Sequence, residues 1–188
     1  MQRLLMSVFL ALEALPTAAQ SGPGWSYRAT ITADLWDRLL ILGLTSANGE
    51  SRALIRCPYA QGRTVIDMTL AASVDDTHNG AAAELILAAP GLSRRLEGWV
   101  MRESGWVEGV VVSLDAADPL WDALVGTQTL EYARPDHPPA TLPLDGFADL
   151  ARRFVDDCRS IADLPALPAQ SQPGASPTKR WREPLQQG

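Results

Sequence analysis

Residues 51–57 read Ser-Arg-Ala-Leu-Ile-Arg-Cys, and their alternation is the starting point for the fold. Ala53, Ile55 and Cys57 share one side of an extended chain, while the residues between them, two of which are arginines, share the other. Successive side chains of a β-strand point to opposite faces of the sheet, so the pattern predicts a strand with one buried face. Cys57 should therefore point into the core beside Ile55.

The second decisive stretch is residues 142–158, Leu-Pro-Leu-Asp-Gly-Phe-Ala-Asp-Leu-Ala-Arg-Arg-Phe-Val-Asp-Asp-Cys. Spacings of three and four residues place Phe147, Leu150, Phe154 and Cys158 on one stripe of a helix, which we predict over residues 146–159. The opposite face carries acidic and basic side chains and is interpreted as solvated. Cys158 is thus also expected to face the core.

Cys57 and Cys158 are the two cysteines of the chain, and a disulfide bond between them is predicted. In an exported protein a small even number of cysteines favours a bridge, and both sulfurs are expected on core-facing positions. Closing a loop of about a hundred residues should stabilise the fold by ~4–5 kcal/mol. Two separate buried thiols are the alternative, and no Cys-x-x-Cys or neighbouring histidine indicates a catalytic thiol.

Around these two stretches the chain reads as a series of short β-strands separated by turn residues. Glycine and asparagine mark several of the turns, as in Ala47-Asn48-Gly49 and Pro90-Gly91. The pattern predicts a mainly β protein, an antiparallel sandwich or small barrel with a short helix and a C-terminal helix. Residues 39–44 (Leu-Leu-Ile-Leu-Gly-Leu) are apolar on both faces and predict a central strand. The predicted strands are 25–32, 38–44, 52–57, 64–70, 83–89, 95–101, 107–113 and 127–133.

A short helix is predicted over residues 118–125, because Asp118 can cap it, Pro119 suits its first turn and Gly126 can end it. Residues 161–188 contain five prolines among Ser, Gln and Ala, a composition that predicts a disordered tail. The expected organisation is a signal peptide at 1–19, a β-rich domain at 20–160 and this tail.

The first twenty residues, MQRLLMSVFLALEALPTAAQ, predict export. Arg3 precedes an apolar run that ends at Leu15, and small residues follow, which is the pattern of a cleavable secretory signal. Cleavage after Ala19 would leave Gln20 first. An amphipathic first helix of a cytosolic protein is the alternative. The predicted location is periplasmic or secreted.

Charge narrows the range of partners. The signal segment holds one Arg and one Glu, so the whole net charge of −6 belongs to the remaining chain, where Lys179 is the single lysine. A negative surface without a basic stripe argues against nucleic acid as a partner. No other stretch is long and apolar enough to predict a membrane span after signal cleavage.

No sequence pattern predicts catalytic residues, a metal site or a cofactor. His78 and His137 are the two histidines, both in expected loops, and zinc would need three or four ligands at regular spacing. The oxygen-rich loop 75–80 lacks the spacing of a calcium loop. Serine-nucleophile and phosphate-loop motifs are missing from the sequence. Tryptophans 25, 36, 99, 106 and 121 are expected to fill the core and its edges, with a ligand platform as the alternative.

The strand at 54–57 and the closing segment 142–158 together resemble small exported proteins of Gram-negative bacteria. These are the invasion-associated locus B family and a type VI secretion-associated periplasmic family. The resemblance covers residues 25–159 and implies a signal peptide, a β-sandwich and a late Leu-x-Gly-Phe-like turn before a final helix. The chain departs from it in having one pair of cysteines, and in lacking an aromatic residue directly after Cys158.

The function predicted from these features is a non-enzymatic periplasmic protein that binds another protein or an envelope component. The alternatives are a hydrolase acting on an envelope polymer and an enzyme inhibitor that presents the loop 75–80. An enzyme predicts a concave pocket in which His78 or His137 lies near an aspartate. An interaction module predicts a flat or convex apolar patch.

Overall fold

The computed structural model describes residues 23–60, 63–102 and 107–166, which form one antiparallel sheet and two α-helices. The strand order is β1-β2-β3-β4-β7-β6-β5-β8-β9. The strands are β1 (Gly24–Thr30), β2 (Leu39–Thr45), β3 (Ser51–Pro58), β4 (Val65–Ala71), β5 (Ala82–Ala89), β6 (Leu92–Met101), β7 (Gly109–Asp115), β8 (Thr129–Ala133) and β9 (Ala140–Pro143). The helices are α1 (Leu120–Val125) and α2 (Phe147–Arg159), with a short 3-10 turn, η1 (Leu35–Asp37), before β2.

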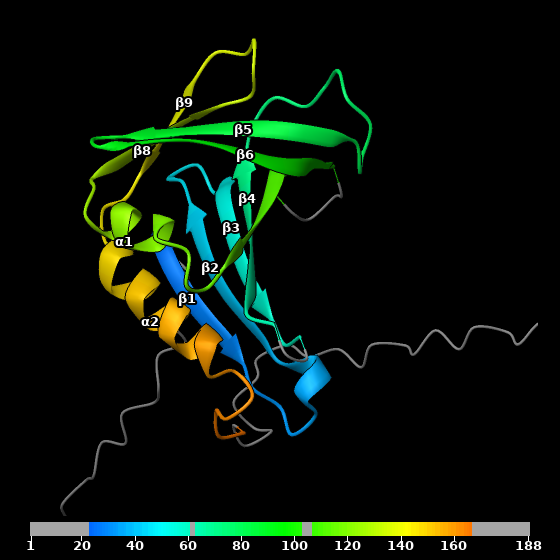
Figure 1. Ribbon diagram of the computed structural model, residues 1–188, viewed down its shortest axis with the longest axis vertical. Coiled ribbons are helices and arrows are strands. Elements are labelled where there is room, and N and C mark those ends of the chain that lie inside the picture. The colour runs from blue at the N-terminus through cyan, green and yellow to red at the C-terminus, as the bar shows by residue number, and fades with distance from the viewer. Residues whose placement is uncertain (1–22, 61–62, 103–106, 167–188) are drawn as a thin grey trace, which may run out of the picture.

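The sheet curls strongly, so that β5 and β6 cross above the steeper strands β1–β4 (Figure 1). The helices α1 and α2 lie together on one side, with α2 alongside β1. The first and last strands approach each other at one corner, where the indole N–H of Trp25 donates to the carbonyl oxygen of Pro143 at 2.9 Å. The predicted mainly β class is confirmed, and the single curled sheet is nearer to a small barrel than to a sandwich.

The eight predicted strands are all present within a few residues of the expected bounds. Strand β9 was not predicted, because Pro138 and Pro139 just before it and Pro143 at its end signal a loop. The apolar segment 39–44 forms β2, which has a neighbour on each side but is only second from the sheet edge. Turns at Gly49 and Gly91 have φ values of 85° and 74°, the left-handed region that glycine adopts readily.

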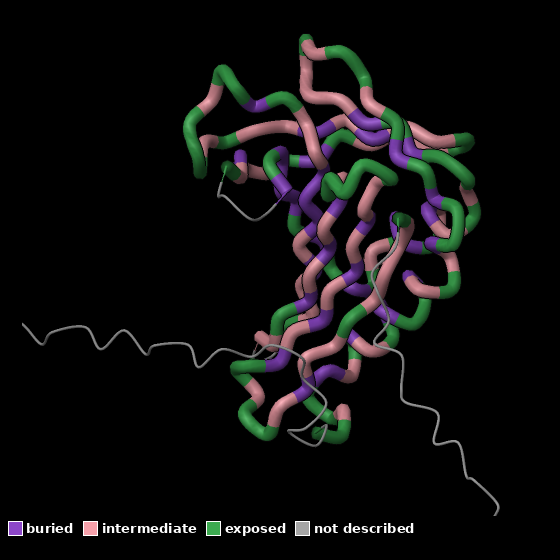
Figure 2. The backbone as a smooth tube through the Cα atoms, turned by 180° about the vertical axis from the view of Figure 1, so that it is seen from behind, coloured by how far each residue is buried: buried purple, intermediate pink, exposed green. Residues whose placement is uncertain are grey.

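Burial follows the predicted alternation. In β3, Ala53, Ile55 and Cys57 are buried while the side chains between them are half-buried. Buried segments gather in the middle of the strands and exposed ones at the hairpin ends (Figure 2). The core therefore lies on the concave side of the sheet, beneath the two helices.

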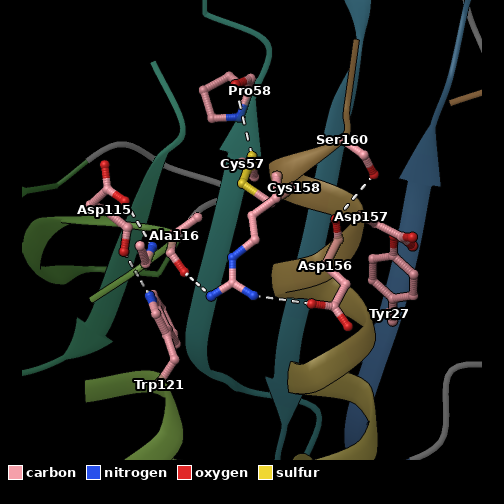
Figure 3. Close-up of a disulfide and its surroundings, with 12 residues drawn as sticks. Tyr27, Cys57, Pro58, Asp115, Ala116, Trp121, Asp156, Asp157, Cys158 and Ser160 are labelled. Atoms are coloured by element: carbon pink, nitrogen blue, oxygen red, sulfur yellow. Dashed lines mark hydrogen bonds and ion pairs between the residues drawn. A yellow bond between two sulfur atoms is a disulfide. The ribbon is translucent and has the colours of Figure 1, made fainter. Parts of the chain in front are cut away.

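The helix α2 is held against the sheet by a disulfide bond, as predicted. Cys57 and Cys158 are bonded, with their Cα atoms 5.9 Å apart, and both are fully buried (Figure 3). Phe147 and Phe154 lie on the same helix face and are also buried, whereas Leu150 is half-buried. Ala151 and Val155 widen this apolar stripe beyond the predicted residues. The bridge thus joins two elements that also pack through their apolar faces.

Polar contacts fix the two helices further. The N-cap of α1 is Pro119 and not Asp118 as predicted. Asp118 lies one residue earlier, where its Oδ1 accepts from the Leu120 N–H at 2.9 Å and its Oδ2 accepts from Arg94 Nη2 at 2.8 Å. Arg159 at the end of α2 donates to the Ala116 carbonyl at 2.9 Å. These contacts tie both helices to the chain around β6 and β7.

The tryptophans do not all fill the core. Trp121 is buried, and Trp25 packs against Phe147 with ring centroids 4.7 Å apart. Trp99 is half-buried in β6. Trp36 is 68% exposed because it lies on the η1 turn, outside the sheet, where one ring edge meets Tyr59. Trp106 lies outside the described residues, as do the predicted signal peptide and residues 167–188 of the predicted tail. The first residues of the predicted tail, 161–166, are described, and Ile161 and Leu164 among them pack against the core.

Candidate binding cleft

A cavity of about 660 Å³ opens where the beginning of β3 and the end of β4 meet the loop between β8 and β9. Its walls come from residues 50–52, 71–73 and 132–140, together with Glu108 just before β7. These segments are far apart in sequence, and the curl of the sheet brings them together. Small and apolar residues form much of the wall, among them Ala71, Ala72 and Pro138.

Arg134 is the centre of a hydrogen-bond cluster beside this cavity. Its Nη1 donates to the Ser73 carbonyl at 2.7 Å and to Asp76 Oδ1 at 2.9 Å, and its Nη2 donates to Thr77 Oγ1 at 3.1 Å. His137 Nε2 lies 3.4 Å from the same guanidinium. Arg134 therefore joins the β8–β9 loop to the β4–β5 loop, and its hydrogen-bonding capacity is largely used.

Asp76 is exposed, yet its carboxylate is stabilised by these neighbours. The hydrogen bond from Arg134 and then that from Thr77 lower the pKa of Asp76 from its ordinary value to about 2. The carboxyl group is therefore ionised across the whole physiological range. It acts here as the acceptor in an ion pair and not as a proton donor.

His137 lines the cavity and lies near an aspartate, which is the arrangement expected for an enzyme. Its Nε2 is 3.8 Å from Asp76 Oδ2. However, Nδ1 is 2.9 Å from the Pro135 carbonyl, a contact that requires a proton on Nδ1. Nε2 then accepts from Arg134, so both ring nitrogens are used. The positional part of the enzyme criterion is met, and both ring nitrogens have a contact partner in the structure.

The other predicted loop residues do not enter the cavity. His78 is exposed in the β4–β5 loop and is not part of the cavity wall. That loop, residues 75–80, is held from a second side by Arg102, whose backbone N–H donates to Asn79 Oδ1 at 2.8 Å and whose Nη1 donates to the Thr77 carbonyl at 3.1 Å. The loop is thus exposed and fixed at both ends. Within the described residues, no group of three or more His, Cys, Asp or Glu side chains is placed to hold a metal ion.

Tyr132 and Arg52 form the inner wall of the cavity. Tyr132 is 1% exposed, and its hydroxyl donates to the Ala71 carbonyl at 2.6 Å. Burial raises the pKa of Tyr132, and the nearby guanidinium of Arg52 offsets part of that effect. Across the described part of the chain, no carboxylate lies within ion-pairing distance of Arg52.

Arg52 also lines a second cavity of about 380 Å³, which reaches Trp25, Leu44, Pro143 and Asp145. The two cavities adjoin at this arginine, which lines both of them. We call these two cavities together the seam groove. It follows the gap between β9 and the first strands of the sheet, near the corner closed by the Trp25–Pro143 hydrogen bond.

Neither arginine of the groove was predicted at a site. Arg52 was assigned only to the second face of its strand, and Arg134 follows the predicted strand 127–133 without an assignment of its own. Neither belongs to a motif, and the partners Tyr132, Ser73 and Asp76 are about 60 to 80 residues away in sequence. The histidines and the tryptophans were the available signals, since His137 lines the first cavity and Trp25 lines the second.

Comparisons with known proteins give little further identity. No protein-family model matches the sequence, and no curated protein matches it either. Among solved structures, the chain is similar to the crystal structure of invasion associated protein B from Bartonella henselae. The sequence identity is 14%, the TM-score is 0.43, and the match covers 73% of this chain and 95% of that chain. This is a weak relation at the level of the fold.

Among the described residues, no helix has both the length and the apolar character needed to cross a membrane.

Proposed function

We propose that this chain is an exported, non-catalytic binding protein of the cell envelope that holds its ligand in the seam groove. The observation that carries the proposal is a contrast between the paired side chains of the groove and Arg52. His137, Asp76 and Arg134 are bound to one another, whereas Arg52 faces both cavities without a carboxylate partner among the described residues. A groove with committed chemical groups and an available cation is suited to holding a ligand and not to transforming it.

Export is supported by two independent features. The first nineteen residues have the pattern of a cleavable signal. The disulfide bond between Cys57 and Cys158 is of the kind that persists in oxidising compartments such as the periplasm. Both features favour a location outside the cytoplasm.

Site-specific photocrosslinking in the native organism tests the proposal. A benzophenone side chain would replace Ser73 in the first cavity or Thr45 in the second, and Glu97 on an exposed face of β6 as the control. We expect the same adduct from both groove positions and none from the control position. Adducts of equal yield from position 97, or none from either groove position, would contradict the proposal.

A hydrolase acting on an envelope polymer is the second candidate, favoured by the 3.8 Å approach of His137 to Asp76 beside a cavity. It would require Arg134 to release these groups during the reaction. Release of soluble fragments from purified cell walls, compared between the wild-type protein and H137N, separates the two functions. The binding proposal expects no release by either protein, and release that depends on His137 would establish the enzyme.

A further inference from the structure

Arg52 differs from most other arginines of the fold in its electrostatic surroundings. In the described part of the chain, arginines 56, 94, 95, 134, 152, 153 and 159 each lie within 4.0 Å of a carboxylate. Arg52 has no such partner, although it is half-buried and lies in the wall of both cavities. A half-buried guanidinium with its planar set of donors is well suited to bind a carboxylate from outside the protein.

The same cavity presents negative charge at other points. Glu50 and Glu108 both line it, both are exposed, and neither pairs with a cation within the described residues. The cavity thus offers a cation and two carboxylates to one bound molecule. A ligand of a single charge sign would be repelled by one of these groups, whereas a ligand that carries both signs would satisfy them.

The cavity wall between these charges is lined by small apolar side chains, which leave room for a ligand. Ala71, Ala72, Ala133, Ala140 and Pro138 all line the cavity. The second cavity adjoins it at Arg52, so the two together offer more length than either alone. Elongation, apolar walls and separated charges of both signs are together the requirements of a short peptide.

We propose that the seam groove binds a short peptide whose free carboxylate pairs with Arg52 and whose ammonium group faces Glu50 and Glu108. This inference rests on the proposed binding function and names its ligand class. The Tyr132 hydroxyl donates to the Ala71 carbonyl at 2.6 Å and is also a hydrogen-bond partner of Arg52, which places Arg52 beside a fixed neutral group.

The test is a titration of the ¹⁵N-labelled protein with an equimolar library of tetrapeptides that have free amino and carboxyl ends, followed by NMR. We expect shifts at the amides of Ala72 and Ala133 in the cavity wall. The same library with amidated carboxyl ends should bind about tenfold more weakly or not at all, since the charge-assisted pair is lost. R52Q should show the same loss, and its glutamine can still donate a hydrogen bond to Tyr132.

R28Q is the matched control, because Arg28 is exposed on β1 and does not line the groove. It should bind the free-carboxyl library like the wild-type protein. Equal binding of the amidated library, equal binding by R52Q, or no shift in the cavity wall with either library would overturn the peptide inference. The binding function itself is decided separately, by the crosslinking yields at the groove and control positions and by the His137-dependent release assay, so the two failures are distinguishable.

Discussion

At the scale of single residues, Gly98 shows how closely the strands approach where the sheet bends. It lies in β6 opposite Val112 of β7. A Cβ atom at this position would lie 2.0 Å from the Val111 carbonyl oxygen, a backbone atom that cannot move aside. A Cβ atom added at Gly109 in β7 would likewise lie 1.9 Å from the Leu70 carbonyl oxygen of β4. Side chains are therefore excluded at the two points where β7 joins both halves of the curled sheet.

We expect G98A to lower the free energy of unfolding by about 3 kcal/mol, because the added methyl group forces backbone atoms of β7 apart. G126A is the matched control, since Gly126 has a negative φ and its nearest contact is an ordinary 3.6 Å. That change should be neutral or stabilise by less than about 1 kcal/mol. Urea unfolding measures both, and equal effects of the two substitutions would contradict the role given to the close approach.

Tyr27 makes the free energy of unfolding depend on pH in the alkaline range. Its hydroxyl donates to Asp157 Oδ2 at 2.6 Å, and burial followed by this hydrogen bond raises its pKa above the ordinary 10.0. The folded protein therefore holds this proton more tightly than the unfolded chain does. The stability that Tyr27 contributes is therefore fully present below pH 10. It is lost as the pH rises further, because Tyr27 then ionises in the unfolded chain before it ionises in the folded protein.

Y27F tests this linkage. The variant should be less stable near neutral pH by roughly 1–2 kcal/mol, because Asp157 loses its donor. Its stability should then fall less steeply than that of the wild-type protein above about pH 10. A residual slope is expected from Tyr132, whose pKa is also raised by burial. Urea unfolding curves from about pH 8 to about pH 12 supply the measurement, and parallel slopes for both proteins would contradict the assignment.

At the scale of elements, β3 and α2 link the sheet to the helices that pack on it. Cys57 and Cys158 are 101 residues apart, so the bridge closes most of the domain. The buried aromatic residues Phe147 and Phe154 hold the same helix against β1, where Trp25 and Tyr27 meet them. The helix is thus attached by a covalent bond at its end and by aromatic packing along its length.

The double variant C57A/C158A should lose about 4–5 kcal/mol, because the unfolded chain regains the entropy of a loop of this length. Because the aromatic packing is unaffected, the variant should still fold and keep the far-ultraviolet circular dichroism of the native protein. Denaturant unfolding of the oxidised wild type, the reduced wild type and the double variant measures the difference. Loss of less than about 1 kcal/mol would mean that the bridge adds little beyond the packing.

The elements that could be predicted from sequence are those with a strong local pattern. Residues 51–57 alternate and 147–158 follow helical spacing, so their buried faces and the disulfide between them followed directly. The strand β9 could not be predicted, because it is four residues long and pairs with β8 despite the prolines around it. Trp36 was misplaced for a different reason: it lies between two predicted strands, on a turn capped by Asp34, but its large apolar side chain was expected to be buried.

At the scale of the whole molecule, the groove could not be predicted, because it exists only through the curl of the sheet. Arg52 meets Tyr132, and Arg134 meets Ser73 and Asp76, across separations of about 60 to 80 residues. A strand pattern gives the face on which a side chain lies, but not which distant strand end lies beside it. Gly98 and Gly109 lie where β7 packs closely against β6 and β4, and the importance of these close approaches is equally hidden in the sequence.

The remaining whole-molecule prediction concerns the compartment, on which the disulfide and the proposed function both depend. A protein exported through the predicted signal should begin with Gln20, and its two cysteines should be unreactive toward a thiol label unless first reduced. Mass spectrometry of the protein purified from the native organism measures both properties at once. The control is the same chain expressed from residue 20 without the signal: it should stay in the cytoplasm, where reducing systems keep thiols free, and take up two labels after unfolding. Full-length protein with an uncleaved amino-terminus and two free thiols would remove the export on which the binding proposal rests, even though the fold itself would stand.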